Sequence, residues 1–291
     1  MKNLITAICL ISSLNYQAQV PSYVPTNGLV GWWPFNGNAN DESGNGNHGV
    51  VLAGVFLVQD RYTMNASAYS IDGVSCVDKR GIEIPAIVNQ NTDYSVSCWF
   101  KISNINQDFQ TIFCSNPHNT VGLSFNHPFG PNILSSGLGN GSNWIVTGQD
   151  GNTFNCDNYS QWNHILLVKQ SQEVRYYING VLARTQPINN LNSNVDFTFD
   201  FGTIDFSAWG CYETLNGSID DIGIWTRALT EPEINAVHAS LNVGIDDLGN
   251  TYKKLLKITD LNGKSIPLLK NTLMLFIYED GSVERVVKMG E

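Results

Sequence analysis

The feature that most constrains the fold is a long succession of short strand-like segments, separated by clusters of Gly, Asn, Asp and Pro. Alternation of apolar and polar residues is clearest in 94–100 and 174–178, and Asn179-Gly180 supplies the positive φ angles of a tight hairpin. Many short strands with few helices predict two sheets packed face to face. The segments lie at 29–35, 49–57, 67–72, 80–84, 94–102, 109–114, 120–126, 132–138, 143–147, 162–169, 172–179, 195–202 and 217–225.

A short helix is predicted after the last of these strands. Helical periodicity begins at Thr230, which has the features of an N-cap, with Pro232 in the first turn and Glu233 three residues after the cap. From residue 250 onward seven basic residues stand against five acidic ones, whereas the whole chain has a net charge of −10. This change in charge marks a domain boundary. Beyond it, strands are predicted at 255–260, 273–278 and 283–288.

The composition excludes several classes of function. A net charge of −10 argues against nucleic acid, whose phosphates require a basic surface, and offers no attraction to anionic lipid. Residues 1–18 combine Lys2 with the apolar run 4–14, which predicts a signal peptide, and no later stretch has the roughly 18 apolar residues of a membrane span. We therefore expect an exported protein without a membrane span, divided into a signal peptide (1–18), a large β domain (19–245) and a small C-terminal domain (246–291).

Export permits disulfide bonds, but the cysteine count does not define their pairing. Cys9 belongs to the signal peptide, and an odd number of cysteines remains after it. Cys98 lies in an alternating strand and is predicted to be a small buried apolar side chain. Pairing stays open among the other four: Cys76, Cys114, Cys156 and Cys211.

The stretch from Gly28 to Gly49 joins a strand rich in aromatics to a loop of Asn, Asp, Ser and Gly. Oxygen-bearing side chains stand at alternate positions of this loop, a pattern that suits a calcium ion: Asp41, Ser43, Asn45 and Asn47. Leu52 at the twelfth position excludes an EF-hand, which needs Glu there. The alternative is a turn cluster without a metal, because the same residue types form turns on their own.

The run GLVGWWPFNGNANDESGNGNHG resembles the opening of a laminin-G-like, concanavalin-A-like jelly-roll domain of secreted bacterial proteins, and LNGSIDDIGIWTRAL resembles the closing strand and following turn of that family. IDGVSCVDKRGIEIP, YSVSCWFKIS, WNHILLVK and VRYYINGVLA resemble its internal strands. The resemblance covers 28–241 and implies an all-β, antiparallel concanavalin-A-like jelly-roll sandwich. It also implies that Asp41 lies near Asp220, so that calcium bridges the opening loop and the closing strand. The alternative for Asp220 is a carboxylate held by loop amides.

The end of the chain has a resemblance of its own. LLKITDLNGKSI and LMLFIYEDGSVERVVK resemble the C-terminal sorting domain of the Bacteroidetes type IX secretion system. This implies delivery to the medium or the outer-membrane surface by that machinery. The ending Met289-Gly290-Glu291 departs from the family pattern. The alternative is an ordinary small β module.

The sequence shows no catalytic constellation. Glycoside hydrolases need two carboxylates facing one sugar, and the run Glu-x-Asp-x-x-Glu of retaining jelly-roll hydrolases does not occur. Asp220 and Asp221 are adjacent on a strand, so they are expected to point to opposite faces. The chain has no G-x-S-x-G elbow, and His164 beside Trp162 is expected to be a packed side chain. We therefore expect no enzymatic activity, and a hydrolase with an unfamiliar constellation is the least favoured alternative.

The aromatic residues give the remaining functional signal. Alternating strands place one group of tryptophans in the predicted core: Trp99, Trp162 and Trp225. A second group lies in polar segments, where an aromatic face suits a sugar ring: Trp144, Trp209 and Tyr212. The alternative is that each Trp of this group folds back over the end of a sheet. The predicted function is non-catalytic recognition of a glycan or glycoprotein, and the alternative is an adhesin-type or structural module that binds a protein.

Overall fold

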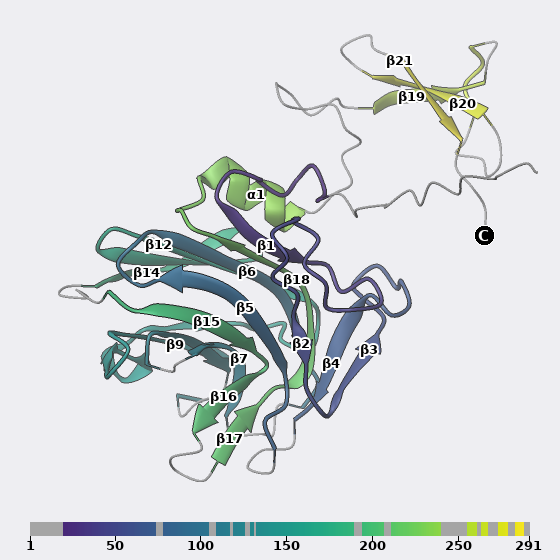
Figure 1. The fold of residues 1–291 in the computed structure, drawn as a ribbon. Coiled ribbons are helices and arrows are strands. Elements are labelled where there is room, and N and C mark those ends of the chain that lie inside the picture. Colours follow the sequence, from purple (N-terminus) through teal and green to yellow (C-terminus); the bar gives the residue numbers. More distant parts are fainter. Residues whose placement is uncertain are drawn as a thin grey trace, which may run out of the picture. The chain divides into compact units, whose positions relative to one another are not determined.

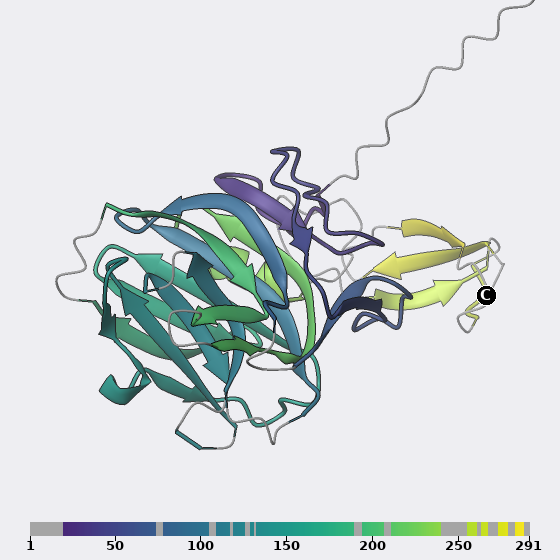
Figure 2. The same ribbon diagram turned by 60° about the horizontal axis from the view of Figure 1, so that its bottom comes forward.

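The computed structural model describes residues 20–73, 78–104, 109–116, 119–125, 129–130, 132–188, 194–206, 211–239, 255–260, 263–266, 273–278 and 283–287. The chain divides into two compact units, residues 1–242 and 243–291, and each is described by itself. The larger unit holds two sheets of antiparallel strands, which can be followed in Figure 1 and Figure 2. The predicted all-β jelly-roll sandwich is confirmed.

Sheet A forms one layer of the sandwich. Its main path runs through β14 (Val181–Pro187), β13 (Glu173–Ile178), β12 (Asn163–Gln170), β6 (Tyr94–Ile102), β18 (Asn216–Trp225), β4 (Ala68–Asp72) and β3 (Val55–Val58). The strand β1 (Leu29–Trp33) pairs with the second half of β18, whereas β4 pairs with the first half. The Asn179-Gly180 turn joins β13 to β14 with φ angles of 49° and 76°, which confirms the predicted hairpin.

Sheet B forms the other layer. Its main path runs through β10 (Trp144–Val146), β9 (Ile133–Gly139), β8 (Val121–Phe125), β7 (Gln110–Asn116), β15 (Asp196–Phe201), β5 (Ile82–Asn89) and β2 (Val50–Val51). The strand β11 (Thr153–Asn155) also pairs with β9, and a short 3-10 helix, η1 (Gly148–Asp150), precedes it in the chain. A separate two-stranded ribbon consists of β16 (Thr203–Phe206) and β17 (Cys211–Thr214).

The core lies between the two sheets because alternate residues of each strand point inward. Strand β6 contributes Val96, Cys98 and Phe100 from sheet A, and β15 contributes Phe199 and Phe201 from sheet B. All five side chains are fully buried, so Cys98 is the small apolar core residue that its alternating strand predicted.

Two tryptophans that were predicted for the core lie outside it. Trp99 points away from the core because Cys98 and Phe100, its neighbours on β6, point into it. Trp162 lies on the same outer face, and both indoles are half-buried. The prediction was wrong because both faces of sheet A carry large side chains, so alternation alone does not identify the inner one.

A second apolar cluster lies on the outer face of sheet A, beneath α1 (Glu231–Ala239), which Figure 1 shows beside β1. Its buried members are Val24, Trp32, Leu166, Val168, Tyr177, Trp225, Leu229, Ile234 and Val237. The helix begins as predicted, because Glu233 Oε2 accepts hydrogen bonds from Thr230 N and from Thr230 Oγ1, each at 2.9 Å.

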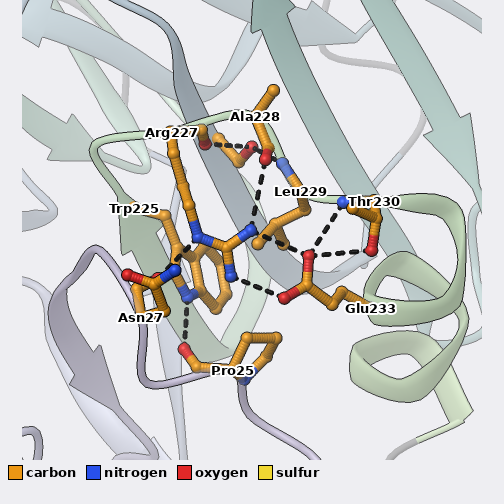
Figure 3. A network of polar contacts seen from close by, with 9 residues as sticks. Pro25, Asn27, Trp225, Arg227, Ala228, Leu229, Thr230 and Glu233 are labelled. Atoms are coloured by element: carbon orange, nitrogen blue, oxygen red, sulfur yellow. Dashed lines mark hydrogen bonds and ion pairs between the residues drawn. The ribbon is translucent and has the colours of Figure 1, made fainter.

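A polar clamp joins the helix to the segment that precedes β1 (Figure 3). Arg227 donates to the two carboxylate oxygens of Glu233 at 2.8 and 2.6 Å and to the carbonyl of Asn27 at 2.7 Å. Trp225 Nε1 donates to the carbonyl of Pro25 at 2.6 Å. The hydrogen bond from Arg227 lowers the pKa of Glu233 to about 2. The clamp therefore covers one end of the outer face with two segments that are far apart in the sequence.

The C-terminal unit is a small antiparallel sheet. Its strands are β19 (Leu255–Thr259), β20 (Leu273–Tyr278) and β21 (Val283–Val287), close to the strands that the sequence predicted. Thr259 and Met274 are buried in it. The signal peptide predicted for residues 1–18 lies outside the described residues, and so does the ending from Met289 to Glu291.

Two of the four cysteines whose pairing the sequence left open are not in disulfide bonds within the described residues. The thiols of Cys114 and Cys156 are free and buried, so neither forms a disulfide bond in the described part of the chain. Burial raises the pKa of Cys114 above its ordinary value and that of Cys156 to about 12, which keeps both thiols protonated and unreactive. Cys76 and the side chain of Cys211 lie outside the described residues. Among the helices that the structure describes, none has the length and apolar character of a membrane span.

Candidate functional site

The outer face of sheet A changes in character along its strands. At one end it is covered by α1 and the N-terminal segment, whose apolar side chains form the cluster described above. In its middle it holds a buried group of charged and aromatic side chains around Arg61. At its other end a line of side chains is left open to solvent, and we take this open end as the candidate site.

Five side chains form this line, which we call the outer row. Phe56 of β3 pairs with Ser70 of β4, Ser70 pairs with Ser218 of β18, and Ser218 pairs with Lys101 of β6. Directly opposed residues of antiparallel strands project to the same face. Lys101 Nζ then lies 5.3 Å from the ring centre of Trp162, the residue before β12. Four strand spacings of about 4.8 Å make the outer row roughly 19 Å long.

A recess of about 650 Å³ lies along the outer row. Its polar lining consists of three hydroxyls, two amides and one ammonium group: Ser70, Ser103, Ser218, Gln59, Asn65 and Lys101. Phe56 at one end of the outer row is 61% exposed, so its ring is available to a ligand. Such a surface can donate and accept hydrogen bonds and can also pack against a flat apolar face.

Some of these polar groups are engaged within the protein and others are not. Ser70 Oγ donates to the carbonyl of Gly217 at 3.2 Å, and Gln59 Nε2 donates to Asn65 Oδ1 at 2.9 Å. The side chain of Ser218 is only 4% exposed, and its hydroxyl has no hydrogen-bond partner among the residues that the structure describes. The hydroxyl is open to the recess, so it can donate to or accept from a ligand there.

Arg61 fixes the position of the loop that forms the wall of the recess. This residue belongs to the loop between β3 and β4 that also carries Gln59 and Asn65. Its guanidinium contacts Asp220 Oδ2 at 3.0 Å and Asp221 Oδ2 at 2.6 Å. The guanidinium carbon also lies 4.4 Å from the ring centre of Trp99 and 4.5 Å from that of Tyr62.

The charges in this middle zone are strongly coupled. Burial by itself would lower the pKa of Arg61, but the charges of Asp221 and Asp220 raise it above its ordinary value. Burial raises the pKa of Asp220 well above its ordinary value, and the neighbouring charge of Asp221 adds to this effect. One guanidinium therefore compensates two buried carboxylates and fixes the loop that walls the recess.

The two aspartates correct a prediction, because they were expected to point to opposite faces. Asp220 pairs with Trp99 and Gly223 pairs with Ser97, so β18 has one more residue than β6 between these pairs. This is a β-bulge, and Asp221 lies in it with a φ angle of 45°. The extra residue turns the second carboxylate onto the outer face, where both meet Arg61. The prediction was wrong because it assumed that β18 continues without a bulge at Asp221.

His164 lies behind this charged group, as a packed side chain. Its Nε2 is 2.8 Å from Ser97 Oγ, and its ring is 5.2 Å from the ring of Trp99. The ring of His238, on α1, stacks on Trp99 at 5.7 Å and lies 5.4 Å from the ring of His164. Burial lowers the pKa of His164 well below its ordinary value, with further contributions from His238 and Arg61. The imidazole is therefore neutral at pH 7.

The aromatic residues predicted to bind a ligand lie elsewhere. Trp144 is in β10, and its ring lies against the backbone of Gly122 and Gly137, where an added Cβ would come within 3.3 and 2.7 Å of it. It thus covers part of the outer face of sheet B and remains half-buried. Tyr212 lies in β17 of the separate ribbon, and Trp209 lies outside the described residues. Their ligand role stays a prediction.

The predicted metal ligands have other hydrogen-bond partners. Asp41 Oδ1 accepts from the backbone N–H of Trp32 at 3.0 Å and of Ser43 at 2.9 Å, and Asp41 Oδ2 accepts from that of Asn47 at 3.0 Å. Ser43 Oγ accepts from Asn45 Nδ2 at 3.0 Å. Asp220 is paired with Arg61, as described above. Within the described residues no three His, Cys, Asp or Glu side chains gather as a metal centre requires, so calcium stays a prediction.

Two other carboxylates meet on the outer face of sheet B. Glu83 of β5 is directly opposite Asp200 of β15. Lys79 Nζ lies 2.6 Å from Glu83 Oε1 and 2.8 Å from Asp200 Oδ2, so one ammonium group holds both acids. Burial raises the pKa of Asp200 above its ordinary value, while Lys79 acts against this shift. A shared ion pair of this kind is a structural contact, because neither acid is free to meet a substrate.

Sequence reasoning missed the outer row. Ser70 and Ser218 occur in ordinary alternating strands, and Trp162 was assigned to the core. The sequence does show polar residues that alternate with apolar ones in each strand. These residues do not show which strands become neighbours in the sheet. Strands β3, β4, β18, β6 and β12 are brought together only by the sheet order.

A comparison with protein families agrees with this fold. Residues 78–235 match a family model, Laminin_G_3, described as the concanavalin A-like lectin/glucanases superfamily. Because this match spans more than half of the sequence, the chain belongs to that superfamily. A search of curated proteins returned no match.

Several solved structures have a similar fold. The binding domain of botulinum neurotoxin DC in complex with rat synaptotagmin II shares 20% identity at a TM-score of 0.56, covering 88% of this chain and 63% of that one. The receptor-binding domain of botulinum neurotoxin D shares 17% identity at a TM-score of 0.57, with coverages of 89% and 75%. The Trypanosoma rangeli sialidase shares 14% identity at 0.54, with coverages of 77% and 35%. The chain thus spans less than two thirds of the first of these structures, and such identities show the fold alone.

Proposed function

We propose that the sandwich is a non-catalytic recognition module that binds carbohydrate in the recess of sheet A. The observation that carries this proposal is the outer row itself, in which hydroxyl and ammonium groups lie between two aromatic side chains, Phe56 and Trp162. Sugars offer hydroxyls for the polar groups and a C–H face for an aromatic ring. The family description names lectins and glucanases, which supports carbohydrate as the ligand class.

Recognition without catalysis is supported by the lining of the recess. Glycoside hydrolysis requires two carboxylates on either side of the bond to be cleaved. None of the lining residues in the described part of the chain is an acid, and the nearby Asp220 and Asp221 are both bound to Arg61. A surface of this composition can hold a saccharide but lacks the pair of carboxylates that glycoside hydrolysis requires.

A glycan array probed with the full-length protein tests the proposal. Phe56→Ala and Trp162→Ala should abolish binding to the saccharides that the wild-type protein retains, because each removes one aromatic end of the outer row. Trp144→Ala tests the site predicted from the sequence. Ile87→Ala removes an equally exposed apolar side chain from sheet B and serves as the control. Binding that is lost in Trp144→Ala but kept in Phe56→Ala would move the site to sheet B.

A protein ligand is the second candidate, and one observation favours it. The segment of β3 and the loop after it exposes four large apolar side chains, Phe56, Leu57, Tyr62 and Met64. Exposed apolar groups of this kind are common where a protein partner binds. An array without any bound glycan, together with saturable binding of a host or matrix protein that Phe56→Ala and Met64→Ala abolish, would establish this candidate instead.

For localisation, we propose export by the signal peptide at 1–18 and delivery by the type IX machinery through residues 246–291. The separate C-terminal sheet supports a detachable signal, because a compact unit does not need the sandwich for its own fold. Deleting residues 246–291 should leave the melting temperature of the sandwich nearly unchanged and should abolish surface delivery in the native host. A truncated protein that still reaches the surface, or that fails to fold, contradicts this.

Calcium at the loop around Asp41 also remains a proposal. Asp41 is the only acid among the predicted ligands of the loop, and three backbone N–H groups already share its carboxylate, so an ion would have to compete with them. Calcium should raise the melting temperature by mass action, and Asp41→Ala should remove that response. If calcium and a chelator leave the wild-type melting curve unchanged, the loop is a turn cluster only.

A further inference from the structure

Lys101 is set apart by its place in the recess, where it contacts no carboxylate of the described residues. Five other basic side chains contact acids: Arg61, Lys79, Arg80, Arg175 and Arg227. Lys101 instead places its ammonium group over the ring of Trp162, and no carboxylate within the described residues contacts it. Lys169, Arg184, Lys257 and Lys264 also contact no acid within the described residues, but Lys101 alone among these cations lines the recess.

We infer that the recess selects a saccharide that carries a single acidic group, which binds to Lys101. This rests on the proposed function of the recess. The ammonium group offers three donors, and Ser218 beside it in the outer row adds a hydroxyl without a partner in the described part of the chain. An ammonium and a hydroxyl side by side suit a carboxylate or sulfate, because hydrogen bonds between ionised groups are roughly twice as strong as neutral ones.

The two aromatic residues of the outer row, Trp162 and Phe56, have different roles. Trp162 is a positioning residue, since its ring face holds the ammonium group of Lys101 in place by a cation–π contact. Phe56, at the other end of the outer row, is the face that a sugar ring can stack against. Three strand spacings separate Phe56 from Lys101, or about 14 Å. The ligand is therefore an oligosaccharide long enough to reach both, rather than one sugar.

The charge distribution argues against a polyanion. Lys101 is the only basic residue that lines the recess among the described residues, and the protein as a whole has a net charge of −10. A heavily sulfated chain would be repelled by most of the surface, whereas one acidic group can be accommodated at one ammonium group. This distinguishes the expected ligand from those of basic glycan-binding surfaces.

The test compares matched ligands on the full-length protein. The probes are a neutral tetrasaccharide that carries one glucuronate, its carboxyl-reduced form, the same backbone with one sulfate, and heparin. Isothermal titration should show that the glucuronate form binds at least about tenfold more tightly than the reduced form, the effect of one charged hydrogen bond. The sulfate form shows whether the site distinguishes a carboxylate from a sulfate, and heparin should bind weakly.

Three variants locate the effect. Lys101→Gln should remove the preference for the acidic form and leave the affinity for the reduced form unchanged, and Lys101→Arg should retain the preference. Lys264→Gln removes the same charge from the C-terminal unit and should change nothing. Equal binding of the acidic and reduced forms, a preference that survives in Lys101→Gln, or tightest binding of heparin overturns the inference while the proposed function stands. Absence of binding to every saccharide overturns both.

Discussion

The covered and the open end of the outer face of sheet A belong to the same strands, yet they are built in opposite ways. At the covered end, Trp225 of β18 and Leu166 of β12 are fully buried under α1. At the open end, Ser218 of β18 lines the recess, and Trp162 before β12 lies against Lys101, which also lines it. One face of a sheet can thus serve as a second core over part of its length and as a binding surface over the rest.

The zone around Arg61 separates the two ends. Its ion pairs tie the loop that walls the recess to β18, the strand that both ends share. A change in this zone should therefore affect both ends, a change at the covered end should affect stability alone, and a change at the open end should affect binding alone. The four predictions that follow use this division, beginning with the largest expected effect.

Arg61→Met should lower the free energy of unfolding by about 3 to 5 kcal/mol, because it leaves two buried carboxylates without a partner. Arg80→Met is the matched control, since Arg80 pairs with the more exposed Asp72 and its loss should cost about 1 kcal/mol or less. Urea denaturation measures both. Asp220→Asn with Asp221→Asn in the Arg61→Met background should recover part of the loss. An Arg61 variant as stable as the Arg80 variant would mean that the middle zone does not hold the two ends together.

Ile234→Ala should cost about 3 kcal/mol, because Ile234 is fully buried between α1 and the sheet and its truncation leaves a cavity. Phe56→Ala at the open end should change the stability by no more than about 0.5 kcal/mol, since the ring is exposed. The same urea titrations compare the two. Saccharide binding should show the reverse order, with Ile234→Ala near wild type and Phe56→Ala inactive. Similar costs for both variants would remove the distinction between the ends.

Acid should destabilise the middle zone through His164. Its folded-state pKa lies well below the unfolded value of about 6.5, so its contribution is complete above that pH and is lost as the pH falls. The stability should therefore fall between pH 7 and pH 5, because the unfolded chain takes up the proton first. The raised pKa of Asp220 acts in the opposite direction, because the folded protein then takes up protons more readily than the unfolded chain.

The histidine contribution is therefore isolated as the difference between the wild-type protein and His164→Gln. Melting temperatures are measured for both at several pH values from 7 to 5. The stability of His164→Gln should fall less steeply with acid than that of the wild-type protein. Parallel curves for the two proteins would show that His164 does not sense pH.

The smallest effect concerns the N-cap of α1. Thr230→Ala removes the hydroxyl that donates to Glu233, and the expected cost is about 1 kcal/mol. Thr226→Ala is the control, because Thr226 Oγ1 makes only an exposed hydrogen bond of 3.3 Å to the carbonyl of Gly28. Thermal unfolding monitored by circular dichroism compares them. Equal melting temperatures for the two variants would show that the cap does not anchor the cover over the sheet.

Much of the fold was predictable because its signals are local. Alternation identified β6 and β13, the dipeptide Asn179-Gly180 identified the hairpin, and Thr230 with Glu233 identified the start of α1. Each of these depends on residues that are close in the sequence. The candidate site has no such signal, since its residues come from strands that are far apart in the chain and become neighbours only in sheet A.

Local patterns in the sequence are enough to specify antiparallel strands around an apolar core, with a short capped helix after the last strand of the sandwich. The tertiary structure decided which face of sheet A became the core, where Trp99 and Trp162 would point, and that Asp221 would turn beside Asp220 onto Arg61. The difference lies in how far apart in the sequence the interacting residues are. Alternation and capping act between neighbouring residues, whereas a β-bulge, an ion pair between residues 61 and 221, and a row across several strands exist only after the sheets have packed.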